Sequence, residues 1–204
     1  AYRRRRLPIM SDEVGTEEAN GGNSLGTESP EAPKTPPGKA LRELVEGEFL
    51  GSILDQSAYE DREDEVTFIL NGDVLVKVAV YLRDHPASSF KILTDLTAVH
   101  YPDDEYTFHI VYQLVSVDHC RLIRLKVKLK EGQEVPTVSG VWSSANWMER
   151  EVYDLFGVRF KDHPDPRRIF MPEDWGSHPF RKDYPLEGLG ERVYTKPKRK
   201  EIGE

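Results

Sequence analysis

The sequence predicts an α+β fold in which helices pack on one face of a mainly antiparallel sheet. Helical and strand periodicities follow one another along the chain in the order helix, strand, helix, three strands, helix. Two of the strands alternate apolar with polar residues, which is typical of an antiparallel sheet with one buried face. Composition divides the 204 residues further. We expect a disordered segment at 1–36, an α+β core domain at 37–160 and an extended C-terminal arm at 161–204.

The first segment is rich in Gly, Pro, Ser, Thr and Glu and holds few large apolar side chains, so it cannot bury enough surface to order itself. Met10 would be an ordinary start residue. We expect the residues before it to be an artefact of start assignment rather than a targeting segment, because acidic residues follow the Arg3–Arg6 run at once. This run and the basic run at 196–200 are expected to be solvated.

The first helix is predicted at 39–49, where apolar residues recur at helical spacing. Residues 50–64 are interpreted as a connector. A short strand follows at 65–70 and ends at the turn residues Asn71 and Gly72.

A second helix is predicted from Asp73 to His85, with the Asp73 side chain as its N-terminal cap. The next segment, 90–101, is apolar and partly β-branched, and it is interpreted as a strand.

Two alternating strands are predicted at 106–117 and 121–130. The short loop between them indicates a hairpin. The side chains expected to face the core are Tyr106, Phe108, Ile110, Tyr112 and Leu114 in the first strand, and Ile123, Leu125, Val127 and Leu129 in the second.

The third helix, predicted at 141–156, carries Glu149 inside its apolar arc, whereas Arg150 and Asp154 point away from that arc. A carboxylate among core side chains is unfavourable unless it is paired or hydrogen-bonded. Either Glu149 lies at the rim and reaches water, or it meets a cation from the arm or from another chain. Trp147 lies on the polar side, and an exposed Trp indicates a partner surface.

The arm contains too many prolines for a helix or a sheet interior, but it also holds many large apolar side chains. We expect it to lie on a partner, with folding back on its own sheet as the alternative. The cations expected to pair with a partner's carboxylates are Arg167, Arg168, Arg181 and Lys182. His163 and His178 each precede a proline without compact metal-ligand spacing, so we expect them to set turns.

The totals exclude several classes of function. The net charge of −8 argues against a nucleic-acid footprint. No apolar stretch approaches the roughly 20 residues that cross a bilayer, so membrane association is expected only through a partner. The single cysteine, Cys120, can form neither an internal disulfide nor a cysteine-ligated cluster, and we expect it to be buried or half-buried in a reducing compartment.

Two motifs carry a resemblance to a known family. The run from Ala145 to Val158 (Ala-Asn-Trp-Met-Glu-Arg-Glu-Val-Tyr-Asp-Leu-Phe-Gly-Val) resembles the hallmark of the 30-kDa subunit of respiratory complex I, which is the C subunit of bacterial NADH-quinone oxidoreductase. The run from His178 to Leu186 matches the family's second block, and 136–142 resembles the stretch before the helix. The resemblance covers roughly residues 40–187. A lone Glu-Arg-Glu would carry no weight, but two blocks in order are specific.

The resemblance implies a structural subunit, not catalytic by itself, of the peripheral arm of a proton-translocating NADH:quinone oxidoreductase. It implies no cofactor on this chain, with FMN and Fe–S clusters in partner subunits. The implied partners are the 49-kDa quinone-site subunit and adjacent Fe–S subunits, at the cytoplasmic face of the bacterial cell membrane. The alternative is the equivalent subunit of a membrane-bound hydrogenase or another donor-dehydrogenase complex. The residues carried over as interface positions are Trp147, Glu149, Arg150, Glu151, Asp154, His163, Arg167, Arg168, His178, Arg181, Lys182, Asp183 and Tyr184.

Two other classes of function remain open at this point. A stand-alone enzyme would use Glu149 and Glu151 as an acid–base pair, although residues two apart do not share a helix face. A free peptide-binding module would use the edge of the sheet.

Overall fold

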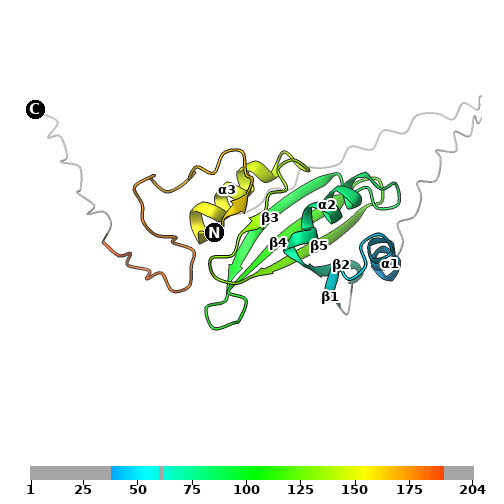
Figure 1. Cartoon of the computed structure of the whole chain (residues 1–204), viewed down its shortest axis with the longest axis horizontal. Helices are drawn as coiled ribbons and strands as arrows, with labels where there is room; N and C mark the ends of the chain where they lie inside the picture. The colour runs from blue at the N-terminus through cyan, green and yellow to red at the C-terminus, as the bar shows by residue number, and fades with distance from the viewer. Residues whose placement is uncertain (1–37, 60–61, 191–204) are drawn as a thin grey trace, which may run out of the picture. The chain divides into compact units, whose positions relative to one another are not determined.

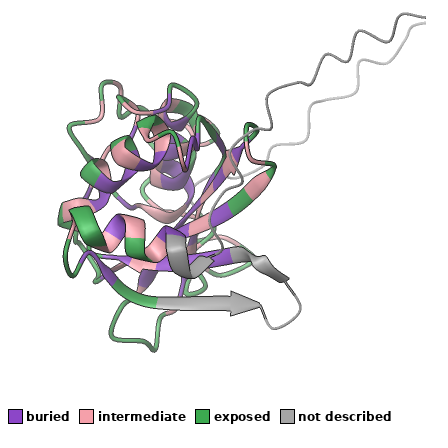
Figure 2. Ribbon diagram, turned by 90° about the vertical axis from the view of Figure 1, so that its right-hand side faces the viewer, coloured by how far each residue is buried: buried purple, intermediate pink, exposed green. Residues whose placement is uncertain are grey.

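The computed structural model describes residues 38–59 and 62–190, and there it forms an α+β fold (Figure 1). A five-stranded sheet has the strand order β1-β2-β5-β4-β3, and helices lie on one side of it (Figures 1 and 2). The predicted fold class is therefore confirmed. The elements are α1 (Gly38–Glu48), β1 (Ile53–Tyr59), β2 (Arg62–Leu70), the 3₁₀ turn η1 (Gly72–Val74), α2 (Leu75–Asp84), β3 (Ile92–His100), β4 (Phe108–Ser116), β5 (Arg121–Leu129), β6 (Val135–Pro136), α3 (Ala145–Phe156) and β7 (Phe160–Lys161).

The sheet is mainly antiparallel. Strands β1 and β2, β3 and β4, and β4 and β5 pair antiparallel, whereas β2 and β5 pair parallel. The predicted hairpin of β4 and β5 is confirmed, with Tyr112 opposite Leu125. The short strands β6 and β7 form a separate parallel pair that brings the end of α3 back beside the loop after β5.

The core lies between the sheet and the helices (Figure 2). The inward residues predicted for β4 and β5 are buried, except Tyr106, which precedes β4 and is exposed. The opposite face of β5 carries Arg124, Lys126 and Lys128 at intermediate exposure, as the alternation predicts. The periodicity therefore identified the buried face of the sheet.

The interpretation of 50–64 as a connector is wrong, because strand β1 lies within it. This strand is at the edge of the sheet and pairs with β2 alone. Its sequence, Ile-Leu-Asp-Gln-Ser-Ala-Tyr, shows no sustained alternation. An edge strand can be held by backbone hydrogen bonds to one neighbour, so it needs no regular apolar face to form.

Two predicted helix starts are also wrong. The second helix begins at Leu75, and its N-cap residue, Val74, makes no side-chain cap bond. Asn71 instead caps the preceding 3₁₀ turn, where its side-chain oxygen accepts from the Asp73 N–H at 3.2 Å. The third helix begins at Ala145 rather than near residue 141. The preceding Trp142 is buried in a turn, where its indole N–H donates to the Phe90 carbonyl at 3.2 Å.

Cys120 is exposed, so the prediction of a buried or half-buried thiol is wrong. It lies in the turn between β4 and β5 with a φ of 52°. A residue in this left-handed turn comes before the alternating part of the strand, so the strand periodicity did not report its exposure.

The prediction of a disordered segment at 1–36 lies outside the described residues, as does the basic run at 196–200. Within 38–59 and 62–190, no helix is long and apolar enough to span a bilayer.

Substitution of Tyr112 tests how the core is packed. Its ring is fully buried, and its hydroxyl has no hydrogen-bond partner among the described residues. A buried unsatisfied hydroxyl costs about 1–3 kcal/mol. We expect Tyr112→Phe to leave the free energy of unfolding unchanged or to raise it by about 1 kcal/mol, measured by urea denaturation. Tyr112→Ala should lower it by about 3 kcal/mol or more through the cavity it leaves. A clear loss for Tyr112→Phe would contradict this packing.

Candidate functional site

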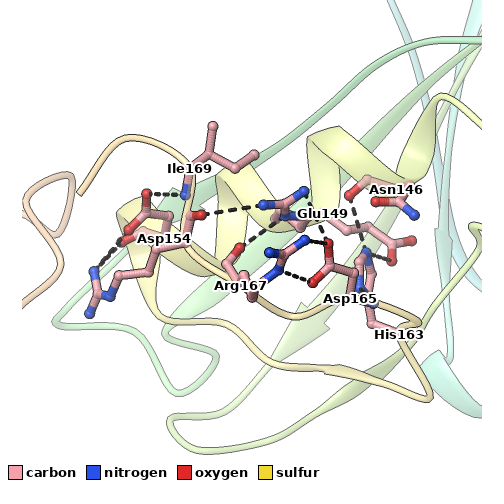
Figure 3. A network of polar contacts seen from close by, with 9 residues as sticks. Asn146, Glu149, Asp154, His163, Asp165, Arg167 and Ile169 are labelled. Carbon is pink, nitrogen blue, oxygen red and sulfur yellow. Dashed lines mark hydrogen bonds and ion pairs between the residues drawn. The ribbon is translucent and has the colours of Figure 1, made fainter. Parts of the chain in front are cut away.

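The candidate site is the contact between α3 and residues 162–190, the described part of the predicted arm. This arm segment folds back along α3 (Figure 3). His178 and Arg181 also bond to the end of α3, so the two family motifs meet in space. The alternative expectation, folding back on the chain's own sheet, holds in part: the described segment folds back on this chain, but mainly along α3. The segment contacts α3, the end of β3, the start of β4 and the loop after β5.

Asp154 anchors the arm segment. Its side chain is fully buried, and its Oδ2 accepts from three consecutive backbone N–H groups, those of Ile169, Phe170 and Met171, at 2.9, 2.6 and 2.9 Å. Its Oδ1 accepts from Arg168 at 2.8 Å. Burial pushes the pKa of this carboxyl up, but the three N–H groups and the Arg168 guanidinium outweigh burial and hold the pKa below its usual range. The ionised carboxylate therefore stabilises the folded state at neutral pH, and this stabilisation is lost as the pH falls through the lowered pKa.

The last carbonyl groups of α3 are satisfied by the arm segment. A helix leaves these groups without intrahelical partners. Here the side chains of His178 and Arg181 and one backbone N–H supply the donors. The pairs are His178 Nδ1 with Asp154 O at 2.9 Å, Phe180 N with Leu155 O at 3.0 Å, and Arg181 Nε with Phe156 O at 2.7 Å.

Gly157 ends α3 with a φ of 81°, the left-handed conformation that glycine commonly supplies just past a helix end. A Cβ at this position would lie 2.6 Å from Cδ2 of the His178 ring. The glycine is therefore required both for the left-handed backbone and for the close approach of the arm segment. The His178 pKa is lowered, chiefly by burial, which favours the neutral ring that donates to the helix.

Arg150 is buried between α3 and the arm segment. Its Nε donates to the carbonyl of Arg167 at 2.9 Å, and its Nη2 donates to that of Arg168 at 3.3 Å. Asp165 lies 3.4 Å from its Nη1, and the guanidinium stacks over the Trp147 ring. Arg150 and Asp154 were expected to point away from the apolar arc, and they are nevertheless buried, because the arm segment covers that side of the helix.

Glu149 is fully buried, so the expectation that it reaches water at the rim is wrong. Its Oε1 accepts from the Val138 N–H at 2.7 Å, and its Oε2 accepts from the Thr137 hydroxyl at 2.5 Å. Burial raises the pKa of the carboxyl to about 7, against the opposing effect of these two hydrogen bonds. The loop before α3 thus satisfies a carboxyl that the sequence flagged as costly.

His163 is the arm residue that comes nearest to Glu149. Its Nδ1 accepts from the Asp165 N–H at 3.0 Å, which places the ring proton on Nε2. That Nε2 lies 3.1 Å from the Asn146 carbonyl and 3.7 Å from Glu149 Oε2. Among the described arm residues, the alternative of a cation at Glu149 is therefore met only by the His163 ring, whose Nε2 lies 3.7 Å from Oε2.

Three of the four arm cations pair with carboxylates of this chain. Arg168 pairs with Asp154 as described, Arg167 pairs with Asp165 at 2.6 Å, and Arg181 Nη2 pairs with Glu131 at 2.9 Å. Lys182 lies with its ammonium over the Tyr101 ring, and its backbone N–H donates to His100 Nδ1 at 2.9 Å.

Contacts thus bring most of the predicted site residues together, but not all of them. Trp147, Glu151, Arg167, Lys182 and Asp183 are exposed, whereas Glu149, Arg150 and Asp154 are buried. Sequence reasoning missed Thr137, Val138 and Asp165, and nothing in their local sequence marks them as partners of Glu149 and Arg150.

An acid–base pair of Glu149 and Glu151 does not form. Glu149 lines a cavity of about 290 Å³ together with Arg150, Tyr153 and His163, whereas Glu151 is exposed and is not in that lining. No group of three or more His, Cys, Asp or Glu side chains suited to a metal ion occurs in the described part of the chain.

The fold and the site define an α+β protein in which hydrogen bonds and ion pairs hold an extended arm segment against helix α3. Residues 68–189 match the family described as the respiratory-chain NADH dehydrogenase 30-kDa subunit. The chain is 42% identical over 159 residues to the C subunit of the NADH-quinone oxidoreductase of Paramagnetospirillum magneticum, covering 76% of this chain and 79% of that one. The corresponding protein of Streptomyces coelicolor, which has the same name, is 39% identical over 186 residues, covering 83% and 74%.

The chain therefore belongs to the 30-kDa subunit family of the respiratory-chain NADH dehydrogenase, and the predicted resemblance is confirmed. Among solved structures, a chain of the archaeal membrane-bound sulfane sulfur reductase, a respiratory membrane complex, has the same fold. Its TM-score is 0.60 and its identity 23%, over 79% of this chain and 98% of that chain.

Asp154→Asn tests the anchor. The amide keeps one oxygen but presents an NH₂ group either to Arg168 or to the three backbone N–H groups. We expect the free energy of unfolding to fall by about 3 kcal/mol or more and the arm segment to become sensitive to trypsin. Glu151→Gln, an exposed change on the same helix, should stay within about 0.5 kcal/mol. An arm that stays resistant in Asp154→Asn would show that other contacts hold it.

Glu149→Gln tests the buried carboxyl through pH. A folded-state pKa of about 7, above the ordinary 4.5, means that the folded protein keeps a proton that the unfolded chain has lost. The stability of the parent protein relative to Glu149→Gln should therefore fall by up to about 3 kcal/mol as the pH rises through this interval, and stay level above it. Urea denaturation of both proteins across the pH range measures this. Parallel pH profiles would mean that Glu149 is charged at its ordinary pKa.

Proposed function

We propose that this chain is a structural subunit of a proton-translocating NADH:quinone oxidoreductase that holds the quinone-reducing module together and carries no redox centre. Electrons would pass from NADH through FMN and Fe–S centres to quinone in other subunits. Membership of the 30-kDa subunit family and the names of the relatives support this proposal. So does the single cysteine, since cysteine-ligated clusters take several thiolates.

One observation carries the proposal: the arm segment is fixed largely by polar contacts, while four of its large apolar side chains remain more than half exposed. Phe170, Phe180, Leu186 and Leu189 are all more than half exposed, and so is Trp147 on α3. Large apolar side chains that are this exposed are typical of surfaces that another polypeptide covers. Because the segment is already held in place, binding would not have to order it, and this favours affinity.

The partners that we propose to cover these side chains are the 49-kDa quinone-site subunit and the adjacent Fe–S subunits. The chain would lie at the cytoplasmic face of the bacterial cell membrane, where only the complex attaches it. The core domain at 37–160 would then be the scaffold and the arm at 161–204 the part that binds partners. The interface residues would be those of the two family motifs, with the buried ones fixing the arm and the exposed ones meeting the partner.

A double variant, Phe170→Ser with Leu186→Ser, tests this function. Both side chains are exposed, so the melting temperature of the isolated chain should hardly change. If a partner covers them, each should contribute about 1 kcal/mol or more, and the two together should lower the amount that co-purifies with the complex from solubilised membranes about tenfold or more.

The matched control is Val117→Ser with Leu122→Ser, two exposed apolar residues at the turn between β4 and β5. This variant should co-purify like the parent chain. Equal recovery of all three proteins would remove the arm from the interface. A parent chain that co-purifies with no NADH dehydrogenase subunit would remove the proposed function itself.

A further inference from the structure

A pocket of about 390 Å³ lies between the arm segment, the loop after β5 and the residues that follow α3. Three arginines line it, Arg159, Arg168 and Arg181, together with a single carboxylate, Glu131. The chain as a whole has a net charge of −8. A concave site with an excess of guanidinium groups is therefore unlike the average charge of the molecule and calls for an anionic occupant.

Two of the arginines are held in fixed positions. Arg168 donates through Nη1 to oxygens of Asp154 and Ser177, which leaves its Nε and Nη2 for another acceptor. Arg181 is fixed by the Phe156 carbonyl and by stacking on the Phe108 ring. Guanidinium groups positioned in advance lose little entropy when they bind a carboxylate.

The third arginine, Arg159, is exposed and forms no hydrogen bond or ion pair through its side chain within residues 38–59 and 62–190. Glu131, which lies on the loop after β5 and is itself half exposed, already presents a carboxylate to Arg181 at 2.9 Å. The pocket therefore accommodates a carboxylate on one side and has an unpaired cation on the other.

From this arrangement we infer that the pocket binds an Asp or Glu side chain from a neighbouring polypeptide of the complex, with Arg159 as its principal partner. Phe180 lies between the pocket residues His178 and Arg181 in the sequence and is exposed, so a chain that covers Phe180 passes beside the pocket. The inference rests on the proposed function, since it needs a partner subunit, and it adds the chemistry of the contact.

Arg159→Glu in the assembled complex is the test, with Arg159→Gln as the milder variant. Both should melt like the parent chain when isolated, because the Arg159 side chain has no partner to lose among the described residues. In membranes solubilised at about 0.1 M salt, we expect Arg159→Glu to be retained in the complex about tenfold less than the parent chain, with Arg159→Gln between them. Lys77→Glu, the same charge change on the exposed side of α2, should be retained like the parent chain.

A photo-crosslinking amino acid at Gln133, which also lines the pocket, identifies the occupant. The crosslinked peptide should come from another subunit and contain Asp or Glu, and changing that acid to Arg should restore retention of Arg159→Glu. Normal retention of Arg159→Glu, a crosslinked segment without an acid, or crosslinking only within this chain would overturn the inference. Failure of the parent chain itself to co-purify would instead overturn the proposed function.

Discussion

The buried carboxylate of Asp154 is the constraint on which the arrangement of this molecule depends. A carboxylate with no access to water must receive hydrogen bonds, and here three consecutive backbone N–H groups and one guanidinium supply them. All of these donors lie in the arm segment, 14 to 17 residues further along the chain. Satisfying one side chain of α3 therefore fixes the path of an arm whose prolines prevent it from forming regular structure.

A consequence follows for function. Polar groups attach the arm segment to α3, with Arg150, His178 and Arg181 adding to the anchor at Asp154. Four apolar side chains of the segment, Phe170, Phe180, Leu186 and Leu189, remain more than half exposed, where a neighbouring subunit would cover them. If burial of these apolar side chains held the arm in place, they would be covered within this chain and could not contact a partner. The charged residues of both family motifs therefore have a structural role, because they attach the arm segment to α3.

Much of the fold could be predicted from the sequence, because alternation in β4 and β5 directly reports which face is buried. The edge strand β1 could not, since its pairing depends on backbone hydrogen bonds that leave no pattern in the side chains. The site was predicted in part. Glu149 was flagged because it interrupts an apolar arc. The burial of Asp154, outside that arc, was not predicted, because helical periodicity records one buried face and does not report a segment that covers the other.

The most direct test of this account is amide hydrogen exchange at Ile169, Phe170 and Met171 in the isolated chain, compared with Asp154→Asn. If the carboxylate holds the arm segment before any partner arrives, these three amides exchange slowly in the parent chain and rapidly in the variant. Exchange at unprotected rates in the isolated parent chain would contradict the account, because the arm would then be ordered only by its partner.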